Sequence, residues 1–196
     1  MDFPLQLRFK VLTLFSQKAT VTDANGQFVC FLKQRSFRFR EKVEVFADPE
    51  RSQLLATISA DRILDWSARY TFHDANGQEI GSVGRKGGRS LWRAHYEVFN
   101  PGDNTPDFTI REENPWKKFL DGFLGEIPVV GFFTGFFLHP SYVATRGTQE
   151  SMRLTKEPAF LEGKFRFDKL GDPSPREELN LLLSFLMLNI LEKRRG

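Results

Sequence analysis

The pentapeptide DANGQ occurs twice in the chain, at residues 23–27 and again at residues 74–78. Asn-Gly between alternating apolar residues is the strongest short-range signal for a β-hairpin, because both residues tolerate a positive φ. The first copy lies between ATVT and FVCFLK, and the second lies between RYTF and EIGSVGRK. The sequence therefore predicts the same local structure twice: a strand, a tight turn and a second strand.

The similarity between the two copies continues beyond the turn. KVEVFADP follows the first copy and HYEVFNP follows the second at an offset of 53 residues, and LLATISAD is matched by PDFTIREE at an offset of 52. We predict internal repeats of about four strands near residues 18–60 and 69–112, with a weaker third copy near residues 141–170. So many strands in one domain close into a barrel or pair into a sandwich, because closure removes exposed edges.

The repeated acidic turn also raises the alternative of a metal-binding loop. A calcium loop of the EF-hand type needs glycine at its sixth position and a bidentate glutamate at its twelfth. In DANGQ the glycine is at the fourth position, and the twelfth position is Gln34 in one copy and Arg85 in the other. The sequence favours a structural turn, and we expect no metal.

The C-terminal segment carries the signals of a capped and buried helix over residues 174–195. Ser174, Pro175 and Glu177 stand where an N-cap, a first helical residue and a capping-box glutamate belong. Residues 179–191 are apolar on nearly every side and span about 20 Å, which is too short for a bilayer core of about 30 Å. A helix that is apolar all round must be buried all round, so its expected place is the lumen of the barrel.

Composition is that of an ordinary compact domain without a disulfide framework. The 196 residues suit one domain over residues 1–196, and the net charge of +3 is too small to suggest nucleic acid as a partner. The single cysteine, Cys30, lies in an apolar run typical of a buried strand. The N-terminus lacks the features of a signal peptide, so we expect a cytoplasmic protein, with peripheral membrane association as an alternative.

Together these elements resemble the tubby C-terminal-like superfamily. The closer resemblance is to single-domain LURP-one-related-like proteins, distant kin of phospholipid scramblases and tubby-like proteins. It is carried by VTDANGQ, YTFHDANGQEIG, RSLWRAHYEV, FTIREENPWKKFLD, IPVVGFFTGFFLHPSYVATR and LLSFLMLNILEKRRG. The resemblance implies a mainly β fold, a closed antiparallel barrel of about twelve strands with the C-terminal helix through it. It also suggests a ligand class, since tubby-like proteins bind phosphoinositides and scramblases act on phospholipids.

Two basic stretches, one in each repeat, are candidates for a binding surface. If the units lie side by side, the stretches merge into one surface that attracts anionic lipid headgroups at about 1 kcal/mol per cation. The alternative is that these residues are the solvated outer face of ordinary strands. The candidate anion- or lipid-binding residues are Arg38, Arg40, Arg85, Lys86, Arg89 and Arg93.

An apolar segment at residues 127–138 is the second candidate, and a helix is predicted just before it near residues 115–124. If the segment is exposed, it forms a contact surface for a membrane or a protein partner. If it is buried, it packs over or into the barrel. The candidate contact residues are Trp116, Phe132, Phe133, Phe136 and Phe137.

No catalytic or cofactor motif is recognisable in the sequence. The three histidines, His73, His95 and His139, lack metal-ligand spacing, and neither a G-x-S-x-G elbow nor a P-loop occurs. We expect a non-enzymatic protein that uses no cofactor and interacts with anionic phospholipid headgroups at a membrane surface. Two alternatives stay open: a protein-interaction module built on residues 127–138, and an enzyme of unrecognised type.

Overall fold

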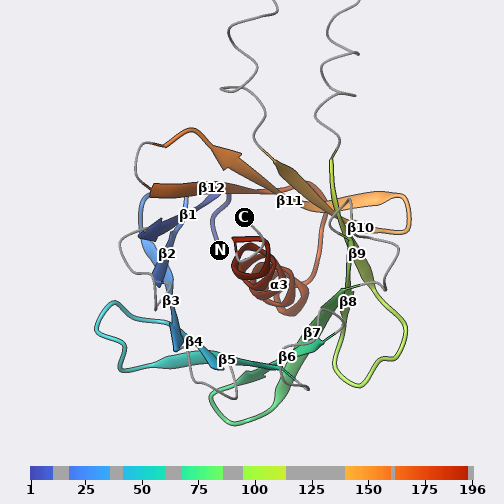
Figure 1. The fold of residues 1–196 in the computed structure, drawn as a ribbon, viewed down its shortest axis with the longest axis horizontal. Coiled ribbons are helices and arrows are strands. Elements are labelled where there is room, and N and C mark those ends of the chain that lie inside the picture. Colours follow the sequence, from blue (N-terminus) through green and yellow to red (C-terminus); the bar gives the residue numbers. More distant parts are fainter. Residues whose placement is uncertain are drawn as a thin grey trace, which may run out of the picture.

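The computed structural model describes residues 1–10, 18–35, 42–60, 68–85, 95–113, 140–159 and 162–193. Within these ranges twelve antiparallel strands form one closed barrel, and each strand pairs with the strands before and after it along the chain. β1 pairs with β12 and so closes the ring (Figure 1). The expected mainly β, twelve-stranded barrel is therefore confirmed.

The strands are short, from five to nine residues each. In chain order they are β1 (Leu5–Lys10), β2 (Lys18–Thr22), β3 (Phe28–Arg35), β4 (Lys42–Phe46), β5 (Leu54–Ala60), β6 (Arg69–Asp74), β7 (Glu79–Arg85), β8 (His95–Phe99), β9 (Phe108–Glu112), β10 (Ser141–Arg146), β11 (Gln149–Glu157) and β12 (Glu162–Lys169).

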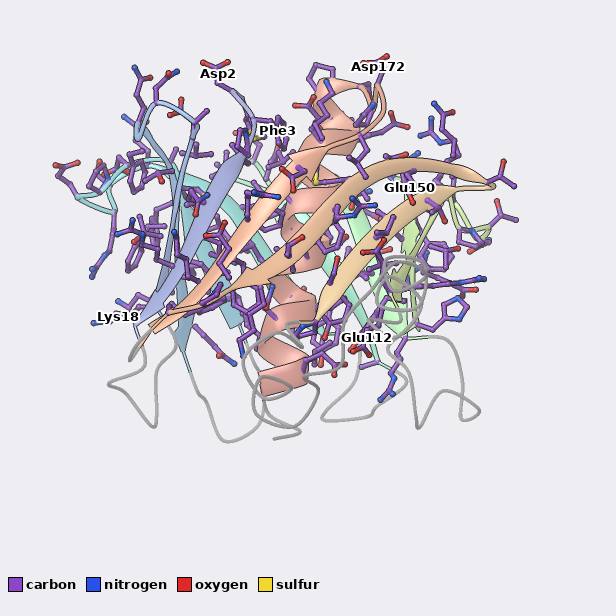
Figure 2. All side chains as sticks on the ribbon, turned by 90° about the horizontal axis from the view of Figure 1, so that it is seen from above. Asp2, Phe3, Lys18, Glu112, Glu150 and Asp172 are labelled. Atoms are coloured by element: carbon purple, nitrogen blue, oxygen red, sulfur yellow. The ribbon has the colours of Figure 1, made fainter. Side chains whose placement is uncertain are left out.

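Successive residues of each strand alternate between the inside and the outside of the barrel. In β1, Leu5, Leu7 and Phe9 are at most 4% exposed and belong to the core, whereas Arg8 between them is exposed. The same alternation buries one row of apolar side chains per strand around a common centre. The hydrophobic core is therefore the lumen, and the outer face carries the polar residues (Figure 2).

Helix α3 (Pro175–Lys193) runs through this lumen, as the sequence predicts (Figure 1). Residues 181–190 are buried without exception. Phe185 of the helix meets Phe167 of β12 edge to face, with ring centroids 5.8 Å apart. The helix lies nearest to β7 and then to β6 and β8, so it is held more closely by one side of the barrel than by the other.

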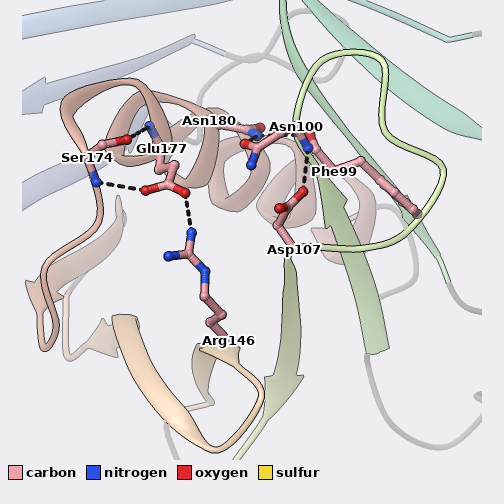
Figure 3. A network of polar contacts seen from close by, with 7 residues as sticks. All are labelled: Phe99, Asn100, Asp107, Arg146, Ser174, Glu177 and Asn180. Atoms are coloured by element: carbon pink, nitrogen blue, oxygen red, sulfur yellow. Dashed lines mark hydrogen bonds and ion pairs between the residues drawn. The ribbon is translucent and has the colours of Figure 1, made fainter.

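The start of α3 is fixed by the expected capping box (Figure 3). The backbone N–H of Ser174 donates to the Glu177 carboxylate at 2.8 Å, and the N–H of Glu177 donates to Ser174 Oγ at 3.4 Å. Glu177 also pairs with Arg146 at the end of β10. This arrangement satisfies free N–H groups of the first turn and ties the helix start to the barrel wall.

The depth of the helix in the barrel is set by a close approach between Asn180 and Gly81 of β7. The Asn180 amide donates to the Phe99 carbonyl at 3.0 Å (Figure 3). A Cβ at Gly81 would stand 2.3–2.6 Å from three atoms of the Asn180 side chain. Only glycine leaves room for Asn180 there, so this contact fixes which turn of the helix faces β7.

The two DANGQ segments form the same hairpin turn. In the first, the Asp23 carboxylate accepts hydrogen bonds from the N–H groups of Asn25 and Gln27 at 2.9 and 2.8 Å. In the second, Asp74 accepts the equivalent two bonds at the same distances. Gly26 and Gly77 have φ of 78° and 81°. Each aspartate thus organises the backbone of its own turn, and both hairpins are as predicted.

Strands β2–β5 are called the first strand group below, and β6–β9 the second strand group. They cover residues 18–60 and 69–112, the ranges that the sequence assigns to its two repeats. Because the strands run alternately up and down, the DANGQ turns and the start of α3 lie at one end of the barrel, called the turn end. In a side view, Asp2 and Asp172 lie at this end and Lys18 and Glu112 lie toward the other (Figure 2).

Candidate functional site

Most of the candidate residues from the sequence lie outside the described part of the chain. Among the six basic candidates, Arg85 is described, whereas Arg38, Arg40, Lys86, Arg89 and Arg93 are not. The same holds for the helix expected at residues 115–124, for the segment at residues 127–138, and for Trp116, Phe132, Phe133, Phe136 and Phe137.

Arg85 lies on the inner face of the barrel. It is directly opposite Tyr96 in the β7–β8 ladder, two residues beyond the buried pair Val83 and Val98. The Tyr96 hydroxyl donates to the carboxylate of Glu192 on α3 at 2.7 Å. Arg85 therefore stands among the groups that surround the end of the helix, and it does not share an outer surface with Lys18 and Lys33, the described cations on the outer face of β2 and β3.

The outer face of β1, β2 and β3 carries an unusual row of lysines. Lys10 is directly opposite Lys18 in the β1–β2 ladder, and Lys18 is directly opposite Lys33 in the β2–β3 ladder. Like charges directly opposite each other destabilise a sheet. The backbone register therefore places three lysine positions side by side, with Glu162 opposite Lys10 at one end of the row and Glu44 opposite Lys33 at the other.

A second cationic pair lies next to this row. Arg8 on β1 is directly opposite Lys164 on β12. Arg8 is two residues from Lys10 on the same strand, so both pairs belong to one outer surface. We call this surface the basic face, and its members are Arg8, Lys18, Lys33 and Lys164; the backbone of Lys10 lies in the same row by its register.

The basic face is only partly neutralised. Lys164 forms an ion pair with Glu157 at 2.9 Å. Within the described ranges Arg8, Lys18 and Lys33 form no ion pair. Glu44 stands opposite Lys33 in the β3–β4 ladder and gives the row an acidic border on that side. Neutralisation at the edges leaves the middle of the row charged.

The candidates named from the sequence in the first repeat, Arg38 and Arg40, lie just after Lys33, and no member of the basic face is among the six basic candidates. Arg8, Lys18 and Lys164 are distant from one another in sequence, and they meet because β1 pairs with both β2 and β12. Strand alternation places Arg8 and Lys10 on one side of β1, and this was the only local signal. Which strands flank β1 follows only from closure of the barrel.

The titratable groups with shifted pKa values do not share a site. Burial raises the pKa of the Cys30 thiol to about 12, so it is an inert core residue. A backbone hydrogen bond from Ser52 lowers the pKa of Asp48, which caps the turn after β4. Each shift therefore has a structural cause, and these groups do not form an acid–base pair of the kind found in active sites.

Two further shifted groups hold the start of α3. The hydrogen bond with Glu178 raises the pKa of Lys169. Burial tends to raise the pKa of Glu177, but hydrogen bonds from Ser174 and the contact with Arg146 outweigh it and lower that pKa. Lys169 therefore joins β12 to the helix, and Glu177 joins β10 to it.

The described ranges contain neither a cluster of metal-ligating side chains nor a membrane-spanning helix. Among the described residues, no three His, Cys, Asp or Glu side chains lie close enough to hold a metal ion. Within the same ranges, no helix combines the length and the apolar character needed to cross a membrane.

Comparison with known proteins gives one match. A family model described as LURP-one-related matches residues 28–168, from the start of β3 to the penultimate residue of β12. No curated protein and no solved structure matches the chain. The matched range includes Lys33 and Lys164 of the basic face, whereas Arg8, Lys10 and Lys18 precede it.

Proposed function

The chain belongs to the LURP-one-related family of the tubby C-terminal-like superfamily, and from this premise we propose that it binds anionic phospholipid headgroups at a membrane surface without catalysing a reaction. The basic face is the proposed contact. The observation that carries the proposal is the direct opposition of Lys10, Lys18 and Lys33 across three neighbouring strands.

The cost of this lysine row argues for a role outside folding. Opposed like charges weaken the sheet, and no carboxylate of the described residues pairs with Lys18 or Lys33. A bound phosphate-bearing surface would remove the repulsion. At about 1 kcal/mol per cation, the three members without an ion pair in the described ranges, Arg8, Lys18 and Lys33, supply about 3 kcal/mol, which corresponds to a Kd of about 10 mM.

The shape of the basic face favours an extended ligand. Neighbouring strands lie about 4.8 Å apart, so the three lysine Cα atoms span about 10 Å on a gently curved sheet. The row lies within regular strands, and it lacks the helix N-terminus or glycine-rich loop that cradles a single phosphate. An array of headgroups matches such a row better than one small anion does.

The proposal is tested by co-sedimentation with vesicles of phosphatidylcholine, with and without phosphatidylserine, over a range of salt concentrations. Binding is expected only with phosphatidylserine, and it should weaken steeply as salt rises, because exposed charges are screened. Inorganic phosphate added at matched ionic strength separates a soluble anion site from a lipid surface. Equal sedimentation with both vesicle types would contradict the proposal.

Matched charge reversals locate the contact. Lys33→Glu on the basic face should weaken binding about tenfold or more, because a favourable contact of about 1 kcal/mol becomes a repulsive one. Arg176→Glu makes the same charge change at the exposed start of α3, at the turn end and away from the basic face, and should leave binding nearly unchanged. Equal losses in both variants would show that only net charge matters.

A further inference from the structure

Charge is distributed unevenly along the barrel axis. The turn end holds twelve carboxylates and only four basic side chains, a net charge of −8. It comprises the N-terminal residues, the connections between strands at that end and the start of α3, namely residues 1–4, 23–27, 47–53, 74–79, 100–107, 146–150 and 169–178.

The rest of the described chain has the opposite sign. It holds fourteen basic side chains and eight carboxylates, a net charge of +6. Lys18 and the other members of the basic face lie in the strand segments away from the turn end, whereas Asp2 and Asp172 lie at the turn end itself (Figure 2). The folded barrel is therefore strongly polarised along its axis.

Part of the acidic charge has a structural cause. Asp23 and Asp74 accept backbone hydrogen bonds within their turns, and Asp48 does so in the turn after β4. Glu177 caps α3. The electrostatic field of these carboxylates acts on any charged surface nearby, whatever the reason for their presence.

The barrel is long enough for its two ends to meet different potentials. The eight residues of β3 rise about 26 Å, which corresponds to about 20 Å along the axis of a barrel with strands tilted by about 40°. The Debye length at physiological ionic strength is about 8 Å. When one end touches a charged surface, the other end is thus screened from it.

From this polarity we infer that the protein binds an anionic bilayer in one orientation, with the basic face and the end opposite the turns toward the lipid and the acidic turn end away from it. The reverse orientation brings a net charge of −8 against a negative surface. This inference rests on the proposed function and adds to it the pose of the bound molecule. It also predicts that the turn end stays accessible while the protein is bound.

Single cysteine variants can measure this orientation. The native Cys30 is 0% exposed, so a thiol reagent will label an introduced cysteine and spare the native one. Thr20→Cys places a label on the outer face of β2, where Thr20 is directly opposite Arg8. Asn25→Cys places a label in the exposed turn of the same hairpin, and Asn76→Cys does so in the equivalent turn of the second strand group.

Each variant carries an environment-sensitive fluorophore and is mixed with phosphatidylserine-containing vesicles, and co-sedimentation is measured on the same samples. The Thr20→Cys label should shift its emission on binding, and both turn labels should not. Binding in which the turn labels shift as much as the Thr20→Cys label would overturn the orientation but not the proposed function. Absence of binding by the unlabelled protein would overturn both.

A charge variant provides an independent check. Glu150 lies at the turn end in an exposed position, and Glu150→Lys makes this end less acidic. If the turn end faces away from the lipid, this variant should bind less than twofold more tightly than the parent protein. An increase as large as the loss caused by Lys33→Glu would show that the turn end meets the membrane and would overturn the inference.

Discussion

The two strand groups have the same arrangement of strands and turns. The second group differs from the first by the larger polar side chains on its inner face, and the first differs from the second by the opposed cations on its outer face. Their DANGQ turns have the same hydrogen bonds, yet their inner positions away from the turn end differ in character. At three of these positions the first strand group has small or apolar side chains where the second has larger, polar ones, and at the fourth Gln34 matches Arg85. In matched order the inner residues are Ala19, Val43 and Ala60 in the first group and Tyr70, Tyr96 and Glu112 in the second.

On the outer face, the pair of opposed cations lies in the first strand group and has no equivalent in the second. Lys18 and Lys33 of the first strand group stand opposite each other without an ion pair in the described chain. At the matching positions the second strand group has Arg69 and Gly84. Arg69 is engaged within the fold: it donates to Ser82 Oγ at 2.9 Å and lies 3.7 Å from the centre of the Phe99 ring.

The comparison separates two roles. The second strand group lies nearest to α3 and supplies both Gly81 for Asn180 and Tyr96 for Glu192. The first strand group contributes part of the lysine row on its outer face. Gly81 and Tyr96, which contact the helix, and Lys18 and Lys33, which belong to the basic face, are therefore in different strand groups and can be altered independently.

The largest expected effect is on Gly81. Gly81→Ala should lower the free energy of unfolding by about 3 kcal/mol, because the new Cβ collides with the Asn180 side chain inside a packed core. The matched change in the first strand group, Cys30→Ala, removes one buried atom and should cost about 1 kcal/mol. Chemical denaturation measures both.

A double variant isolates the contact. Asn180→Ala removes the atoms that meet the new Cβ, so the loss in Gly81→Ala/Asn180→Ala should be smaller than the sum of the two single losses. Additive losses would mean that Gly81 is needed for another reason. In that case the difference between the two groups would not concern the helix.

The two DANGQ turns are expected to contribute equally to stability. Asp23→Ala and Asp74→Ala each remove the acceptor of two backbone N–H groups and should each cost about 1–2 kcal/mol. Equal losses in thermal or chemical denaturation would show that the two turns contribute equally to the free energy of unfolding. A difference above about 1 kcal/mol would show that one hairpin matters more to the barrel.

Opposite signs are expected for matched outer-face variants. Lys18→Gln, at the position that matches Arg69, removes a cation directly opposite two others and should raise the free energy of unfolding by about 0.5 kcal/mol while weakening vesicle binding. Arg69→Gln loses a hydrogen bond and a ring contact and should lower it by about 1 kcal/mol, with little effect on binding. If Lys18→Gln also destabilised the fold, the lysine row would have a structural role.

The smallest effect concerns the start of the helix, which β10 holds through Arg146 and Glu177. The pKa of Glu177 is lower in the folded protein than in the unfolded chain, so its contribution to stability is present at neutral pH. It is lost as the pH falls through the folded-state pKa. In denaturation at a series of acidic pH values, Glu177→Gln should show a shallower loss of stability than the parent protein. Parallel curves would contradict this assignment.

Local patterns were sufficient to predict much of the fold. The Asn-Gly turns, strand alternation and the capping box of Ser174 and Glu177 each depend on residues close together in sequence, and the structure bears them out. The helix, apolar on nearly every side, required burial on all sides, and in a chain of strands the lumen was the one place that offered it. The composition of the helix thus carried information about the whole domain.

Local patterns did not predict which cations lie together on the barrel surface. Sequence proximity grouped Arg85 with other cations, but strand parity turns Arg85 toward the lumen beside Tyr96. Conversely, Arg8 and Lys164 lie at opposite ends of the sequence and are direct neighbours in the structure. A patch on a barrel depends on which strands are adjacent, and this information is absent from any single stretch.

The sequence by itself determined the elements of this protein: two identical hairpin turns, a strand-rich chain and a helix that has to be buried. These follow from backbone preferences and from the cost of exposing apolar side chains to water. Only the tertiary structure decided that β1 closes against β12, that Gly81 receives Asn180, and that Lys18 meets cations on both sides. Register and closure are properties of strand pairs distant in sequence, so the positions of the charges became known only when the barrel was complete.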